Sequence, residues 1–183
     1  DPRDGSVQNL TFEQAGGPWG GGYSFYRGAA EAKRYVPLPR GFTLAGRVRI
    51  GAGDGFGQSS DLPMFRRFYA GGINSTRGYQ RWEVGPRNEF RKPVGGRSLL
   101  EGSVELRMPV PWWKPLGAVV FVDAGEVRRA PFSWSVDAFQ LGVGGGLRYL
   151  TVVGPVRVDV GVPLQRPAGE PGWVVQFSIG QAF

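Results

Sequence analysis

The sequence contains neither cysteine nor histidine. These absences exclude a disulfide scaffold, a thiol nucleophile and a His-based catalytic triad, and they remove the usual zinc ligands. No run approaches the roughly 18 apolar residues of a transmembrane helix, which excludes a helical membrane protein. We therefore expect no enzyme, no catalytic residue, no cofactor and no metal site. The chain opens at Asp1 on polar residues without a signal peptide, as expected of a mature or excised segment.

Positive charge is in excess, but it is scattered. The net charge is +7 and the pI is about 10.2, values that alone would favour nucleic acid or an acidic surface as partner. The charges fall one or two per segment, on alternate residues, with no basic run or basic helix. This spacing favours a barrel lumen and its loops, so we expect no nucleic-acid partner.

Apolar and polar residues alternate along eight segments of the chain, the pattern of membrane-spanning β-strands. The segment 98–108 is the clearest, because its apolar residues share one face and its polar residues share the other: Leu100, Val104, Leu106 and Met108 against Glu101, Ser103, Glu105 and Arg107. The other segments are 7–15, 23–36, 42–50, 117–127, 139–153, 156–162 and 173–183. Mean hydropathy is only −0.22 although 41% of the residues are hydrophobic, which alternation explains. Over residues 1–183 the pattern predicts one all-β domain, an antiparallel transmembrane β-barrel of about eight strands in meander order.

The connections between these segments alternate in length. Those after the second, fourth and sixth segments are short and contain proline, whereas those after the third, fifth and seventh are longer and polar. Outer-membrane barrels have short periplasmic turns and long external loops, and a soluble sandwich has no reason for this asymmetry. Trp112 and Trp113, in one short turn, are expected at the membrane interface, where amphipathic rings settle.

The longest connection, about 54–97, carries the main candidate site. It contains FYAGGINSTRGY, which ends in Arg77, Gly78 and Tyr79. Gly71, Gly72 and Gly78 allow sharp turns and close approach to a wall. We expect the loop to enter the lumen, where Arg77 can bridge the carboxylates of Glu105 and Asp123.

Two alternatives remain open for this site. Arg77 can be a solvated loop arginine, and Asp123 can form a structural salt bridge to Arg107 or Arg148 instead. The nearby glycines at 142, 144 and 146 lack the helix and the Lys-Ser/Thr pair of a phosphate loop, so they are expected to make room in the lumen or to allow curvature. Glu101 and Glu105 could be paired carboxylates of a glycosidase, but no aromatic sugar platform can be placed beside them.

Four motifs in order resemble the BamA/TamA-type superfamily of outer-membrane assembly and translocation barrels. FYAGGINSTRGY is similar to the family's sixth-loop motif, and GGRSLLEGSVELRMPVP and FVDAGEV to the strands that follow it. VQFSIGQAF is similar to the C-terminal strand signal, represented here by Phe177, Ile179, Gly180 and Phe183. The resemblance covers essentially the whole chain and corresponds to the C-terminal half of the family barrel.

The resemblance implies a function without chemistry. It implies an integral protein of the outer membrane of a Gram-negative-type bacterium, or of an organelle equivalent, that contacts the lipid bilayer and inserts or translocates unfolded outer-membrane or secreted polypeptides. The loop arginine would be held by Glu105 and Asp123, and the seam between first and last barrel strands would open as a lateral gate. The runner-up is a passive structural or pore-forming small barrel.

The chain departs from the family in size. The family barrel has about sixteen strands and follows periplasmic POTRA domains, and both the other strands and these domains are missing here. The chain is therefore half of such a barrel, a small closed barrel, or one half of a homodimer. A closed barrel of eight strands has room only for side chains, and the loop could not then lie inside.

Overall fold

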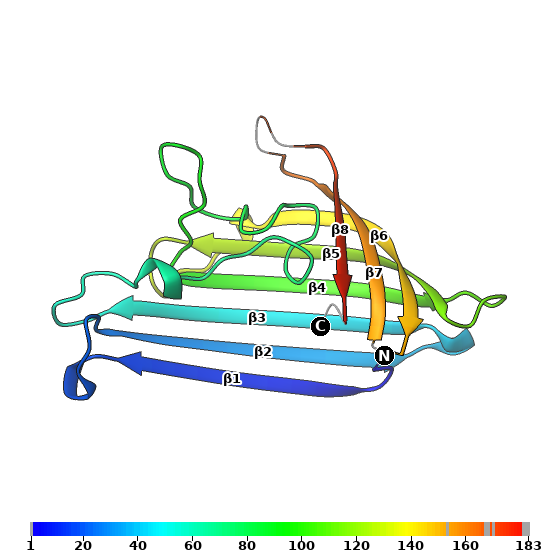
Figure 1. Ribbon diagram of the computed structural model, residues 1–183, viewed down its shortest axis with the longest axis horizontal. Helices are drawn as coiled ribbons and strands as arrows, with labels where there is room; N and C mark the ends of the chain where they lie inside the picture. Colours follow the sequence, from blue (N-terminus) through cyan, green and yellow to red (C-terminus); the bar gives the residue numbers. More distant parts are fainter. Residues whose placement is uncertain (1, 153, 167–168, 170, 181–183) are drawn as a thin grey trace.

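Eight antiparallel strands form one sheet in which every strand pairs with its neighbours in the sequence (Figure 1). The computed structural model describes residues 2–152, 154–166, 169 and 171–180. The strands are β1 (Gly5–Ala15), β2 (Phe25–Pro37), β3 (Thr43–Gly55), β4 (Ser98–Pro109), β5 (Leu116–Arg128), β6 (Gln140–Thr151), β7 (Gly154–Pro163) and β8 (Val174–Ile179). The predicted all-β antiparallel meander is confirmed, with strand boundaries within a few residues of those expected.

Short single-turn 3₁₀ helices occur only in the connections of the described chain. They are η1 (Gly17–Trp19), η2 (Pro39–Gly41), η3 (Met64–Arg66) and η4 (Val136–Ala138). None of the helices in the described residues has the length and hydropathy that a membrane crossing requires.

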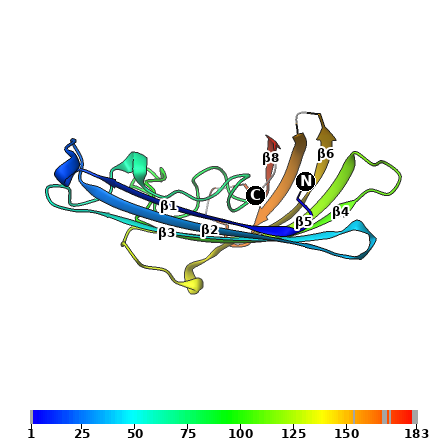
Figure 2. The ribbon, with the colours of Figure 1, turned by 90° about the horizontal axis from the view of Figure 1, so that it is seen from below.

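The sheet is strongly curved but open. β6, β7 and β8 turn up from the plane of the other strands, so that the sheet forms a trough (Figure 2). Among the described residues, β1 pairs only with β2, and β8 pairs only with β7. The small closed barrel is therefore not what forms, and the open curved sheet is consistent with half of a larger barrel.

The two faces of the sheet differ in chemistry, as the alternation predicts. Large apolar side chains are exposed on the outer face of nearly every strand, among them Phe12, Val48, Val104, Val158 and Phe177. Charged and polar side chains, including Arg47, Glu105, Asp123 and Asp159, are buried on the inner face. A polar interior and an apolar exterior are the reverse of a water-soluble fold and match a barrel wall in lipid.

Aromatic residues gather near both ends of the strands. In the short β4–β5 connection Trp112 and Trp113 are both exposed, and the Trp113 ring makes an edge contact with Tyr149. At the opposite end, the ring of Tyr26 stacks between Phe56 and Phe132, which belong to long connections. Aromatic girdles at two levels are typical of membrane barrels.

Candidate functional site

The connection between β3 and β4, residues 56–97 and hereafter the long loop, lies inside the trough (Figures 1 and 2). The sequence placed its start two residues early, because β3 continues to Gly55. The loop is ordered partly by pairing with itself, through isolated bridges between Phe68 and Gly96 and between Ala70 and Val84. These bridges fold the loop back on itself, and contacts with the wall complete its placement.

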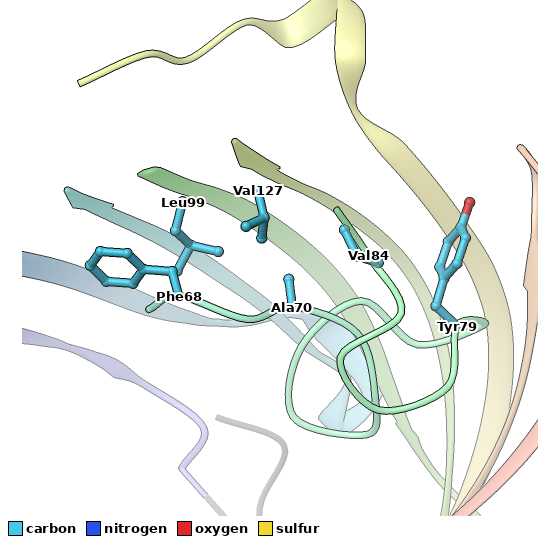
Figure 3. Close-up of a cluster of buried hydrophobic side chains, with 6 residues drawn as sticks. All are labelled: Phe68, Ala70, Tyr79, Val84, Leu99 and Val127. Carbon is cyan, nitrogen blue, oxygen red and sulfur yellow. The ribbon is translucent and has the colours of Figure 1, made fainter. Parts of the chain in front are cut away.

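A small apolar cluster fastens the long loop to the sheet. Phe68, Ala70, Tyr79 and Val84 of the loop pack with Leu99 of β4 and Val127 of β5, and all six side chains are buried (Figure 3). Burying apolar area contributes roughly 25 cal/mol per Å². This cluster positions the Arg77–Gly78–Tyr79 turn over the inner face of β4 to β7.

Arg77 reaches the inner face as a buried cation with several partners. Its Nε and Nη2 donate to Asp123 Oδ2 and Oδ1 at 2.8 and 3.0 Å, and its Nη1 donates to Glu105 Oε2 at 2.7 Å. Its main-chain N–H also donates to Asp123, at 2.9 Å. The guanidinium stacks on the Phe121 ring, with Cζ 3.6 Å from the ring centroid, a cation–π contact. Arg77 is only 1% exposed, so it is not a solvated loop arginine.

A third carboxylate completes the group. Asp159 Oδ2 of β7 lies 3.6 Å from Arg77 Nη1. We call Arg77, Glu105, Asp123 and Asp159 the lumen cluster. The pairing register of β4 and β5 brings Glu105 and Asp123 close together. Ser103 faces Asp123 and donates to it at 2.6 Å, while Glu105 faces Phe121.

Further arginines balance the acids of the lumen cluster. Arg107 Nε donates to Glu105 at 2.7 Å, and Arg148 forms a two-point contact with Asp159, with Nη2 to Oδ2 at 3.1 Å. The sequence suggested these two arginines as alternative partners of Asp123. In the structure Arg107 pairs with Glu105 and Arg148 pairs with Asp159. Removing one partner of a buried ion pair leaves an uncompensated charge, which costs about 3–5 kcal/mol.

Electrostatics keep Arg77 charged. Burial disfavours the guanidinium cation, but the hydrogen bond and charge of Asp123, and then those of Glu105, outweigh it and raise the pKa of Arg77. The site therefore offers a permanent cation held by acids. Its arrangement suits attachment of the long loop to the wall.

The tip of the long loop is held by two more arginines from opposite sides of the trough. Arg47 of β3 donates to the Asn74 main-chain oxygen at 2.7 Å, and Arg157 of β7 donates to the Ile73 oxygen at 2.9 Å. Ser75 hydroxyl donates to the buried Glu101 of β4. The loop thus joins β3, β4, β5 and β7.

Glycines in the wall leave the space that the turn occupies. A Cβ on Gly142 of β6 would lie 1.8 Å from the Arg77 main-chain oxygen, and one on Gly161 of β7 would lie 2.4 Å from the Gly78 nitrogen. Gly78 itself has φ of +100°, and a Cβ on it would lie 3.0 Å from the Val162 main-chain carbonyl carbon, so a side chain there would be strained and crowded. Gly71 and Gly72 also have positive φ, of +99° and +102°.

Tyr79 and the C-terminal strand lie beside the lumen cluster. Tyr79 is buried, and its hydroxyl donates to the Gln165 main-chain oxygen at 3.1 Å. Of the C-terminal strand residues, Phe177 and Ile179 are exposed on the outer face of β8, and the Gly180 N–H donates to the Pro155 oxygen at 2.8 Å. Phe183 lies outside the described residues.

Sequence reasoning missed Asp159, Ser103 as an Asp123 partner, and the Phe121 ring beneath Arg77. Asp159 had a signal, since it is the one acid on the inner face of its strand, next to Arg157 and opposite Gly146. The contacts of Arg47 and Arg157 at the loop tip use main-chain oxygens, which leave no trace in residue types.

Comparisons with known proteins relate the chain to one family. The Omp85 superfamily domain matches residues 1–183. The chain is 34% identical over 191 residues to the outer membrane protein assembly factor BamA of Nitratidesulfovibrio vulgaris, covering 100% of this chain and 23% of that protein. It is 25% identical over 190 residues to the BamA of Neisseria meningitidis serogroup B, covering 87% of this chain and 24% of that protein.

A solved structure shares the fold. The crystal structure of BamA from Haemophilus ducreyi lacking POTRA domains 1–3 superposes with a TM-score of 0.77 at 22% identity, over 97% of this chain and 39% of that one. The chain spans about a quarter of the length of the curated relatives it matches. Those relatives are assembly factors rather than enzymes.

Proposed function

The chain belongs to the Omp85 superfamily, and we propose that it forms the C-terminal part of an integral outer-membrane barrel that assembles polypeptides into that membrane or translocates them. The lipid bilayer and unfolded polypeptides are its partners in this proposal. Its periplasmic partners are POTRA domains, which we place elsewhere in the complete polypeptide. Support comes from curated relatives that are outer membrane protein assembly factors, matched over nearly the whole of this chain.

The observation that carries the proposal is the buried attachment of Arg77 to Glu105 and Asp123. A surface loop of a passive barrel has no need of a fully desolvated cation, because desolvation alone is costly. In the proposed function the lumen cluster keeps the long loop inside the barrel and so maintains a defined interior beside the terminal strand.

The second element of the proposal is a lateral gate at β8. In the described residues β8 pairs only with β7, and when the seam at its other edge opens, the N–H and C=O groups there would invite pairing with another strand, because lipid cannot satisfy them. Because the matched crystal structure is much longer than this chain, we assign the strands that meet β1 and β8 to the same polypeptide rather than to a second copy. Opening the seam at β8 would present a template to an incoming strand.

Replacing Arg77 tests the proposal against the runner-up, a passive structural or pore-forming barrel. In the complete polypeptide, reconstituted in lipid vesicles, we expect Arg77→Ala to reduce both the folded fraction and the assembly of a reporter outer-membrane protein. Arg77→Lys keeps the charge but loses the two-point contact with Asp123, so it should retain more folded barrel while still assembling the reporter slowly.

The matched control is Arg81→Ala, which removes an exposed arginine of the same loop that stacks on Trp82. It should leave folding and assembly unchanged. Wild-type behaviour of both Arg77 variants would sink the proposed function and favour the passive barrel. The folded fraction is read from heat-modifiable mobility on gels, separately from the assembly rate.

A further inference from the structure

In the described residues, a polar contact joins the long loop to the terminal strand. Gln176 of β8 donates from Nε2 to the main-chain oxygen of Tyr79 at 2.9 Å. Gln176 faces inward and lies opposite Asp159 in the β7–β8 register. This contact joins β8 to the residue two positions after the arginine of the lumen cluster.

We infer that Gln176 is a positioning residue, a weak latch by which the docked loop holds β8 and from which β8 can separate while the loop stays in place. The inference rests on the proposed function, since it assigns the moving part of the gate. It differs from a mechanism in which the loop must leave the lumen before the seam opens.

The bond between β8 and the loop is weaker in kind than those that the other strands make to it. β4, β5 and β7 hold the loop through buried charges, with Arg77 alone donating to Asp123 and Glu105 at 2.7–3.0 Å. The bond from Gln176 is between neutral groups, and hydrogen bonds with an ionised partner are roughly twice as strong. Compared with β4, β5 and β7, β8 is therefore the strand that separates from the loop most easily.

Release of Gln176 leaves the Tyr79 main-chain oxygen with a hydrogen-bond donor. The Tyr79 oxygen also accepts a bond from the Gly72 N–H at 3.2 Å, within the loop itself. When Gln176 leaves, that oxygen keeps a donor, so the usual cost of a buried unpaired carbonyl is avoided. On the other side, Gln176 Oε1 has no hydrogen-bond partner in the described residues, so the amide is only half satisfied while it is latched.

The packing between β8 and the loop is open around Gln176. A groove separates β8 from the loop, lined by Gly72, Asn74 and Trp82 on one side and by Val174 and Gln176 on the other. β8 is also the shortest strand described, with six residues paired to β7. In its described residues, β8 is thus held by its short pairing with β7 and by the Gln176 bond to the loop.

Hydrogen exchange in the complete polypeptide, in lipid vesicles, tests the inference. Gln176→Met keeps the length of the side chain but removes the donor. We expect the β8 amides that pair with β7 to exchange roughly two- to tenfold faster, the range for one neutral hydrogen bond. The Gly72 amide donates within the loop and the Arg77 amide donates to Asp123. Both should exchange at the wild-type rate.

The matched control is Ser178→Ala, on the same face of β8, whose hydroxyl in the described part of the chain contacts the adjacent Ile179 oxygen rather than the loop. It should leave the exchange rates of both the β8 amides and the loop amides unchanged. Unchanged exchange of β8 in Gln176→Met would overturn the inference, and so would equal acceleration of the loop amides, because loop and strand would then move together. The exchange result does not depend on reporter assembly, so failure of the latch and failure of the proposed function give different results in the two experiments.

Discussion

Arg77 donates three hydrogen bonds to the carboxylate of Asp123, one from its main chain at 2.9 Å and two from its guanidinium at 2.8 and 3.0 Å. The path of the loop backbone and the direction of its side chain thus depend on the same β5 residue. Glu105 and Asp159 contact only the guanidinium. Asp123 is therefore the acid on which loop position depends most.

We predict that Asp123→Asn lowers the free energy of unfolding by about 3 kcal/mol, because the substitution removes the charge that compensates buried Arg77. The measurement is the urea midpoint of the complete polypeptide in lipid vesicles. Asp137→Asn, at an exposed site in η4, is the control and should shift the midpoint little. Equal midpoints for the two variants would show that the pair contributes nothing to stability.

Gly142→Ala should displace the loop without altering any charge. The new Cβ would lie 1.8 Å from the Arg77 oxygen, and overpacking typically costs about 1–3 kcal/mol. We expect a lower urea midpoint and faster proteolysis of the loop. Gly102→Ala makes the same change at a β4 position with nothing within 4 Å, so it should be near neutral, and similar losses for both glycines would contradict the steric explanation.

Much of the wall could be predicted from the sequence, because a strand between lipid and a polar interior must alternate with period two. The segment 98–108 was expected as a strand, and β4 spans Ser98–Pro109. Curvature could not be predicted, since it depends on how all the strands coil together. The resemblance implied half of a larger barrel, with a small closed barrel as an alternative, and the open trough is consistent with the half-barrel.

The site was predictable where side-chain chemistry is exceptional. An aspartate in the apolar run around Asp123 and an arginine between glycines at Arg77 are both costly unless paired, and the structure has these two residues in contact. Asp159 escaped notice because Arg157 beside it offers an ordinary local partner. Only the upward turn of β7 brings this carboxylate to the loop.

Asp159 should be coupled energetically to Arg77. At 3.6 Å from the guanidinium, it belongs to the same charge network, and residues that share a network couple by about 0.5–3 kcal/mol. A double-mutant cycle with Asp159→Asn and Arg77→Ala, read by urea unfolding, should therefore give a combined loss smaller than the sum. The cycle of Asp159→Asn with Arg81→Ala should be additive within about 0.5 kcal/mol. Strict additivity in both cycles would remove Asp159 from the lumen cluster.

The outer face offers the most direct test of membrane placement. Val120 is half exposed in the middle of β5, on the face opposite to buried Val119 and Phe121. If that face meets lipid, Val120→Arg places a charge near the bilayer midplane and should cost about 2–4 kcal/mol.

Val136→Arg is the matched control, because this valine is also exposed but lies in η4, in the β5–β6 connection. Near or beyond the membrane interface the same substitution should cost at most about 1 kcal/mol. The urea midpoint and the fraction integrated into vesicles are the measurements. If Val120→Arg were as mild as Val136→Arg, the exposed apolar row would face water, and the assignment of this sheet to a membrane wall would fail.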